Sequence, residues 1–146
     1  MGSQVRASCP CGYRRTFTVG GSRQSRLTES YFPYRCMDCG IVEVNIAAEF
    51  PVCPNAAHHE LLRLGGSFRD RMARRDAYEA SKRPHKRSLL ERWGLRKPQP
   101  VIPIEPVPDL DVEVQWGDHE IYDEAYDCPR CGQEALHFKP TGLMFD

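Results

Sequence analysis

The chain contains seven cysteines, whose thiols can ionise and bind metal ions. Six form three close pairs, each followed by a glycine, and the seventh precedes a proline and two histidines. Turn-forming Pro and Gly let backbone N–H groups point at a thiolate, as in a metal knuckle. Two knuckles supply the four ligands of a tetrahedral zinc ion, so the pattern predicts two Zn²⁺ and eight ligands. The predicted ligands are Cys9, Cys11, Cys36, Cys39, Cys53, His58, Cys128 and Cys131.

The eighth ligand has to come from two adjacent histidines. His58 and His59 cannot readily both bind one ion from neighbouring positions in a short knuckle. We predict His58 as the ligand and keep His59 as the alternative. The remaining histidines, at positions 85, 119 and 137, are interpreted as ordinary surface or structural residues.

Alternating apolar residues between the knuckles predict short strands. Residues 9–46 have the order knuckle, strand, loop, strand, knuckle, strand, which is typical of a complete zinc ribbon. This order pairs Cys9 and Cys11 with Cys36 and Cys39. The strands are expected at residues 13–19, 31–35 and 41–46.

A second ribbon is predicted to follow from Cys53. Strands are expected at residues 60–64, 121–126 and 135–139, so Cys53 and a histidine would meet Cys128 and Cys131. A competing pairing joins the knuckle of residues 36–39 to Cys53 and a histidine, and leaves Cys9 and Cys11 to meet Cys128 and Cys131. Strand order favours the first scheme.

The predicted fold is a small, metal-stabilised, β-rich (α+β) protein with two tandem ribbons. Residues 1–50 form the first ribbon, residues 51–66 and 119–146 form the second, and residues 67–118 are an insertion. Ser67 to Asp70 resemble a capping box, which predicts a helix that continues to about Lys82. Five prolines between positions 98 and 108 predict an extended segment after it.

Charge is strongly divided along a chain whose formal net charge is zero. Residues 63–97 hold twelve Lys/Arg against four Asp/Glu, whereas residues 98–127 hold nine Asp/Glu and no Lys/Arg. Such blocks attract each other or recruit an external partner. The basic block is large enough for several phosphate contacts.

Composition limits the broad class of protein. The mean hydropathy is −0.56, and ribbons of about 40 residues seldom bury enough apolar surface to fold without metals. The odd cysteine count argues against a complete disulfide framework, and no secretory signal or membrane span is evident. We therefore expect a cytoplasmic protein that keeps its thiolates available to metal.

The order of knuckles resembles that of small prokaryotic zinc-ribbon proteins with Cys-Pro-x-Cys-Gly knuckles. The resemblance rests on Cys9-Pro10-Cys11-Gly12, Tyr34-Arg35-Cys36-Met37-Asp38-Cys39-Gly40, Cys53-Pro54, Cys128-Pro129-Arg130-Cys131-Gly132 and the tail Gly142-Leu143-Met144-Phe145-Asp146. It covers about 95 residues, outside the insertion, and implies a fold and a metal more than a function. The missing second cysteine after Cys53 departs from the pattern.

The predicted function is non-catalytic binding of RNA or DNA, with a protein–protein adaptor as the alternative. Arginines beside aromatic residues can grip phosphates and stack unpaired bases. The chosen residues are Arg74, Arg75, Arg83, Lys86, Arg87, Tyr13, Phe17 and Tyr34. A rubredoxin-like iron carrier ranks lower, because the long polar insertion and the Cys-x-Cys knuckle favour zinc. A zinc enzyme with Glu60 as base also ranks lower, because no recognisable catalytic motif is present. No small-molecule substrate is indicated.

Overall fold

The computed structural model describes residues 2–22, 24, 27–82, 106 and 111–145. The chain divides into two compact units. The first unit contains residues 1–68 and 110–146, and the second contains residues 69–109. Each unit is described by itself. Among the described residues, no helix has the length and apolar character needed to cross a membrane.

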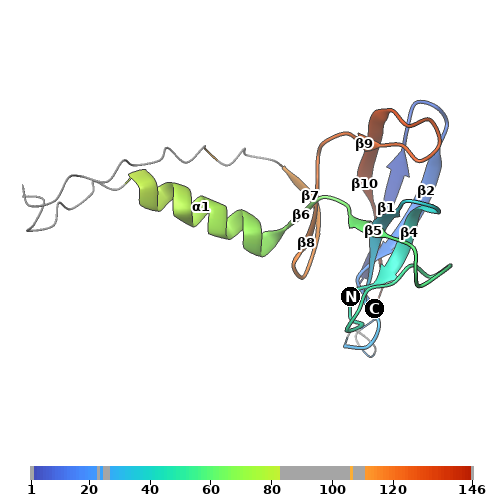
Figure 1. The fold of residues 1–146 in the computed structure, drawn as a ribbon, viewed down its shortest axis with the longest axis horizontal. Coiled ribbons are helices and arrows are strands. Elements are labelled where there is room, and N and C mark those ends of the chain that lie inside the picture. The colour runs from blue at the N-terminus through green and yellow to red at the C-terminus, as the bar shows by residue number, and fades with distance from the viewer. Residues whose placement is uncertain (1, 23, 25–26, 83–105, 107–110, 146) are drawn as a thin grey trace, which may run out of the picture. The chain divides into compact units, whose positions relative to one another are not determined.

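The largest sheet of the first unit joins the two ends of the chain. Its strands, in spatial order, are β2 (Arg14–Val19), β1 (Gly2–Ser8), β10 (Glu134–Phe145) and β9 (Tyr126–Asp127). All neighbouring strands are antiparallel, with Ser8 opposite His137 near one end and Gly2 opposite Phe145 at the other. Figure 1 shows β1, in blue, beside β10, in red. The turn after β1 and the turn before β10 therefore lie at the same end of the sheet.

A second sheet lies entirely within residues 31–63. Its strands are β4 (Gly40–Asn45), β3 (Tyr31–Cys36) and β5 (Leu61–Arg63), with β3 in the centre. Cys36 is opposite both Gly40 on β4 and Leu61 on β5. The turn after β3 and the segment before β5 are consequently neighbours.

The two sheets have the same three-stranded plan, and one is nested inside the other in sequence. In each, the strand before the first knuckle is central and pairs with the strand after that knuckle and with the strand after the second knuckle. We call β2–β1–β10 with its knuckles the outer ribbon and β4–β3–β5 with its knuckles the inner ribbon. Every residue of the inner ribbon lies between β2 and β9 in the chain.

A small third sheet follows the inner ribbon. It contains β6 (Gly66–Ser67), β8 (His119–Tyr122) and β7 (Val112–Trp116). Gly65 has φ +70°, and a Cβ there would lie 2.0 Å from the carbonyl oxygen of Glu120, so only glycine fits. Trp116 packs on Gly20 at the end of β2, where a Cβ would lie 2.9 Å from the indole ring.

One hydrophobic core serves both ribbons. Val5, Phe17 and Phe138 of the outer ribbon belong to the same buried cluster as Phe32 and Val44 of the inner ribbon. Burial alternates along β1, where Val5 and Ala7 are fully buried and Arg6 is exposed. The two ribbons thus share one continuous apolar core.

The second unit contains most of the helix α1 (Phe68–Lys82), which agrees with the predicted bounds. None of its residues is buried. Most of the predicted extended segment with its five prolines lies outside the described residues.

Most predicted strands are confirmed within one or two residues, but the sequence interpretation missed β1, β6 and β7. It also joined β8 and β9 into one strand over residues 121–126. The omission of β1 has the largest consequence, because β1 is the central strand of the outer ribbon.

Candidate metal centres

Two turns at one end of the outer ribbon carry four cysteines. Cys9 and Cys11 lie in the β1–β2 turn, and Cys128 and Cys131 lie in the β9–β10 turn. Each turn closes with a backbone hydrogen bond, from Gly12 N–H to the Cys9 carbonyl at 3.0 Å and from Gly132 N–H to the Cys128 carbonyl at 2.8 Å. We call these four cysteines the outer site.

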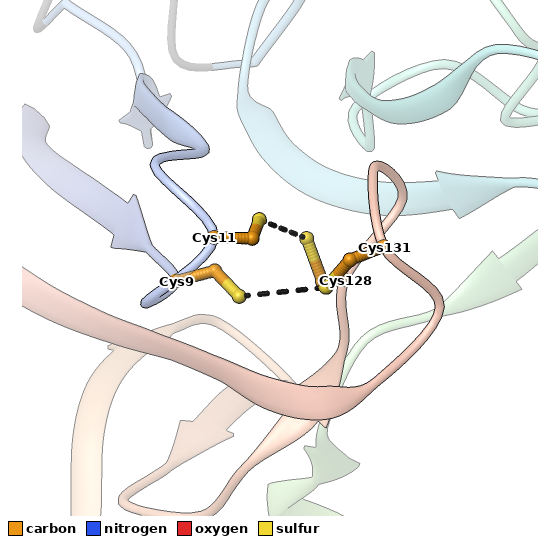
Figure 2. Close-up of side chains that lie close together, drawn as sticks. All are labelled: Cys9, Cys11, Cys128 and Cys131. Carbon is orange, nitrogen blue, oxygen red and sulfur yellow. Dashed lines mark hydrogen bonds between the residues drawn. The ribbon is translucent and has the colours of Figure 1, made fainter.

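The sulfur spacing of the outer site fits a tetrahedral metal ion. Figure 2 shows the four side chains converging from the two turns. The Sγ atoms of Cys9 and Cys131 are 3.8 Å apart, and those of Cys11 and Cys128 are 3.7 Å apart. Four thiolates around zinc at about 2.3 Å would be separated by about 3.8 Å. A disulfide would bring two sulfurs to about 2.05 Å, so the cysteines are not bridged.

The electrostatics of the outer site also fit a bound cation. Burial raises the pKa of Cys128, but hydrogen bonds from the backbone N–H groups of Cys131 and Arg130 outweigh burial. The pKa of Cys128 is therefore lowered to about 7. The Arg130 N–H lies 3.4 Å from this sulfur. At Cys9 the backbone N–H of Cys11 lowers the pKa, yet burial and the neighbouring sulfurs raise it to about 12. Four thiolates cannot coexist here without a positive charge among them.

The inner ribbon positions a second group of four donors. Cys36 ends β3, and Cys39 lies in the β3–β4 turn. Cys53 and His59 lie in the segment between β4 and β5. The Met37 N–H of the knuckle donates a hydrogen bond to the Glu60 carbonyl of this segment at 3.3 Å. We call Cys36, Cys39, Cys53 and His59 the inner site.

The distances of the inner site are those of three sulfurs and one nitrogen around an ion. The Nδ1 atom of His59 lies 3.3 Å from Cys39 Sγ and 3.7 Å from Cys36 Sγ, and Cys53 Sγ lies 3.9 Å from Cys39 Sγ. Typical zinc bond lengths give about 3.6 Å for an S···N edge of a tetrahedron. Burial raises the pKa of Cys53, but backbone N–H groups of the next turn and His59 lower it to about 6. The lowered pKa favours the thiolate form of Cys53, which is the form that binds a metal ion.

The structure places His59, and not His58, among the donors. His59 lies in a turn that its N–H closes on the Ala56 carbonyl at 3.1 Å, and this turn brings His59 Nδ1 to 3.3 Å from Cys39 Sγ. His58 is exposed and packs edge-on against the His59 ring, with centroids 4.8 Å apart. The predicted ligand His58 is therefore corrected to the alternative, His59.

The favoured pairing of knuckles is also wrong. The structure brings Cys9 and Cys11 to Cys128 and Cys131, which is the competing scheme. The physical reason is β1, because its pairing with β10 joins the first and last knuckles across the whole chain. The alternation of Val5 and Ala7 with Gln4 and Arg6 was the signal for this strand.

The two sites are in contact through their knuckles. A Cβ built on Gly40 of the inner knuckle would lie 3.0 Å from the Pro129 Cβ of the outer knuckle. A cavity of about 360 Å³ lies at this junction, and Arg15 and Arg130 contribute to its lining together with Cys39. Arginine near two thiolate-rich clusters offsets their negative charge.

The predicted nucleic-acid residues are placed very differently from one another. Arg74 and Arg75 are exposed on α1, and Tyr13 is half-buried beside the first knuckle. Phe17 is only 1% exposed and Tyr34 only 8% exposed. Their rings belong to the core, so they cannot stack on bases. Arg83, Lys86 and Arg87 lie outside the described residues.

A polar contact fixes the third sheet to the inner ribbon. The hydroxyl of Tyr34 lies 2.8 Å from Nε2 of His119, whose ring also packs on Phe32. Burial and the positive charge of Arg63 lower the pKa of His119 to about 4, against a smaller opposing effect of Asp118. His119 is thus neutral near pH 7 and acts structurally, as the sequence interpretation expected.

Comparison with known proteins gave no match: no protein-family model, no curated protein and no solved structure matches this chain. The metal centres are therefore interpreted from their own geometry and donor chemistry.

Proposed function

We propose that this protein is a non-catalytic zinc-binding module whose two ions hold the nested ribbons together. The observation that carries the proposal is the completeness of both donor sets. Each site presents four soft donors at tetrahedral spacing, which leaves no coordination position for water or substrate. Such closed sites stabilise a fold and do not activate a nucleophile. The resemblance to small zinc-ribbon proteins is consistent with this role.

Zinc is the proposed ion because it is the metal that suits both donor sets. The inner site combines three sulfurs with one histidine nitrogen, a set common in structural zinc sites, and the outer site is a set of four sulfurs that accepts zinc or iron. Elemental analysis of protein purified without added metal should give two zinc ions per chain. Iron, with a visible chromophore, would contradict the proposal.

We further propose that the module binds nucleic acid through its basic helix. From Arg69 to Lys82, α1 carries five Arg/Lys and three Asp/Glu, and it buries none of them. Arg74 and Arg75 are both exposed on this helix. Because Phe17 and Tyr34 are buried, the contacts we propose are to phosphates and involve little base stacking.

The test uses the full-length, zinc-loaded protein and a labelled single-stranded oligothymidylate. Binding should weaken steeply as salt rises, because each neutralised phosphate releases counterions. The double variant Arg74→Glu/Arg75→Glu should lose affinity with both metals retained, and the matched control Arg74→Lys/Arg75→Lys should bind nearly as the wild type does. No binding by the wild type at low salt would refute nucleic-acid binding.

A protein partner is the second candidate, and exposed apolar side chains around the inner site favour it. Phe50 is 73% exposed and Val52 is 48% exposed, just before the ligand Cys53. Met37 of the knuckle and Leu62 of β5 are also exposed. Apolar side chains gathered near one site are typical of protein interaction surfaces. If the adaptor role holds, Phe50→Ser should abolish capture of the partner and leave oligothymidylate binding unchanged.

A further inference from the structure

We propose that the solvent-facing side of the outer ribbon binds the phosphate backbone of a nucleic acid. This inference rests on the proposed nucleic-acid function and adds a surface to it. We call this surface the basic face. Its residues are Gln4, Arg6, Ser8, Arg14, Thr16, Thr18, His137 and Lys139.

Strand register places these side chains on one side of the sheet. Arg6 on the central strand β1 is opposite Thr16 on β2 and Lys139 on β10. Directly opposed residues of antiparallel strands share a face, and residues two apart on one strand do so too. The alternate positions, such as Val5 and Phe138, are buried in the core. The basic face is therefore the side turned away from the core.

The charge of the basic face is positive and only partly neutralised. Arg6 and Lys139 are directly opposed, and like charges in that arrangement destabilise a sheet. Lys139 is paired with Glu113 and Asp123. Among the residues that the structure describes, no carboxylate lies within ion-pair distance of Arg6 or Arg14. Two exposed arginines on this side of the sheet thus keep their charge available to an anion.

The remaining residues of the basic face indicate an extended phosphate backbone as the anion. Ser8, Thr16 and Thr18 are short, so a ligand can approach the sheet closely, and their hydroxyls can donate hydrogen bonds to phosphate oxygens. A nucleic-acid strand repeats its charge along its length, and the basic face offers Arg6 and Arg14 at diagonal positions of two neighbouring strands. The face contains no Phe, Tyr or Trp on which bases could stack, and its one aromatic ring is the imidazole of His137. We therefore expect little base preference.

The experiment measures the salt dependence of oligothymidylate binding by fluorescence anisotropy. The variant Arg6→Ser/Arg14→Ser removes two phosphate contacts, so the slope of log K against log salt should become about 1.4 shallower. Raising salt from 50 to 200 mM should then cost the wild type about sevenfold more affinity than the variant loses. The matched control Arg6→Lys/Arg14→Lys should keep the wild-type slope.

The outcomes separate this inference from the proposed function. If the wild type binds and Arg74→Glu/Arg75→Glu weakens binding, but Arg6→Ser/Arg14→Ser keeps the full slope, the basic face is refuted and the helix remains. If the wild type does not bind, both proposals fail. Metal content and circular dichroism of each variant identify any that is misfolded. In that case Thr16→Glu, which places a negative charge on the same face without removing an arginine, should weaken binding, and unchanged binding would overturn the inference.

Discussion

The contact between the two knuckles can be tested with a single methyl group. Gly40 and Gly132 occupy the same position, directly after the second cysteine of a knuckle, and both have left-handed backbone, with φ +80° and +70°. An added Cβ at position 40 would lie 3.0 Å from the Pro129 Cβ. At position 132 it would meet nothing within 4 Å. Gly132→Ala is therefore a matched control that carries the backbone strain without the contact.

The expected loss of folding stability has two contributions, the left-handed backbone strain and the contact with Pro129. Left-handed backbone costs a non-glycine residue about 1–2 kcal/mol, so Gly132→Ala should lose about that much. Gly40→Ala adds overpacking of about 1–3 kcal/mol, because the new Cβ would lie 3.0 Å from the Pro129 Cβ, closer than ordinary van der Waals contact. The difference between the two variants should thus be about 1–3 kcal/mol.

The assay is urea unfolding of zinc-loaded protein followed by far-ultraviolet circular dichroism. A second readout is the rate at which a chelator removes zinc, which should rise for Gly40→Ala because the strain reaches the outer knuckle. Equal destabilisation by Gly40→Ala and Gly132→Ala would show that the knuckles do not press on each other, and would refute this account of the junction.

Two further predictions concern histidines. His59→Ala should lower the zinc content or affinity of the inner site, whereas His58→Ala should leave two zinc ions bound; loss of zinc from His58→Ala would reverse the ligand assignment. The pKa of His119 is about 4 in the folded protein and 6.5 in a free histidine, so the unfolded chain binds more protons between these two pH values. Folding stability should therefore fall as pH falls from 6.5 towards 4. After allowance for the half-exposed ring, His119→Gln should remove about 1–2 kcal/mol of this pH dependence, and an identical pH profile for wild type and variant would contradict it.

The ligand types could be predicted from the sequence, because short Cys-rich turns flanked by Pro and Gly are local features. The pairing could not, because it depends on a strand pairing that joins residues more than 120 positions apart. The signal for β1 was two small buried residues, Val5 and Ala7, in a segment too short for its alternation to stand out. Without β1, the outer knuckles had no sheet to bring them together.

The choice between two adjacent histidines shows the same limit. His58 and His59 have the same chemistry, and the conformation of the turn before β5 decides which one faces the cysteines. Burial of Phe17 and Tyr34 was likewise hidden, because an aromatic strand residue can serve a core or a surface equally well. Helix α1 was predictable, since its start and its composition are local signals.

The nested arrangement of metal sites is the central claim, and one pair of variants tests it directly by native mass spectrometry. Cys9→Ser/Cys128→Ser removes two ligands from the outer site alone, so the account predicts one zinc ion bound in the untouched inner site. Cys9→Ser/Cys36→Ser damages both sites and should leave neither ion tightly bound. The tandem arrangement predicts the reverse. One retained zinc in Cys9→Ser/Cys36→Ser, with none in Cys9→Ser/Cys128→Ser, would contradict the nested ribbons.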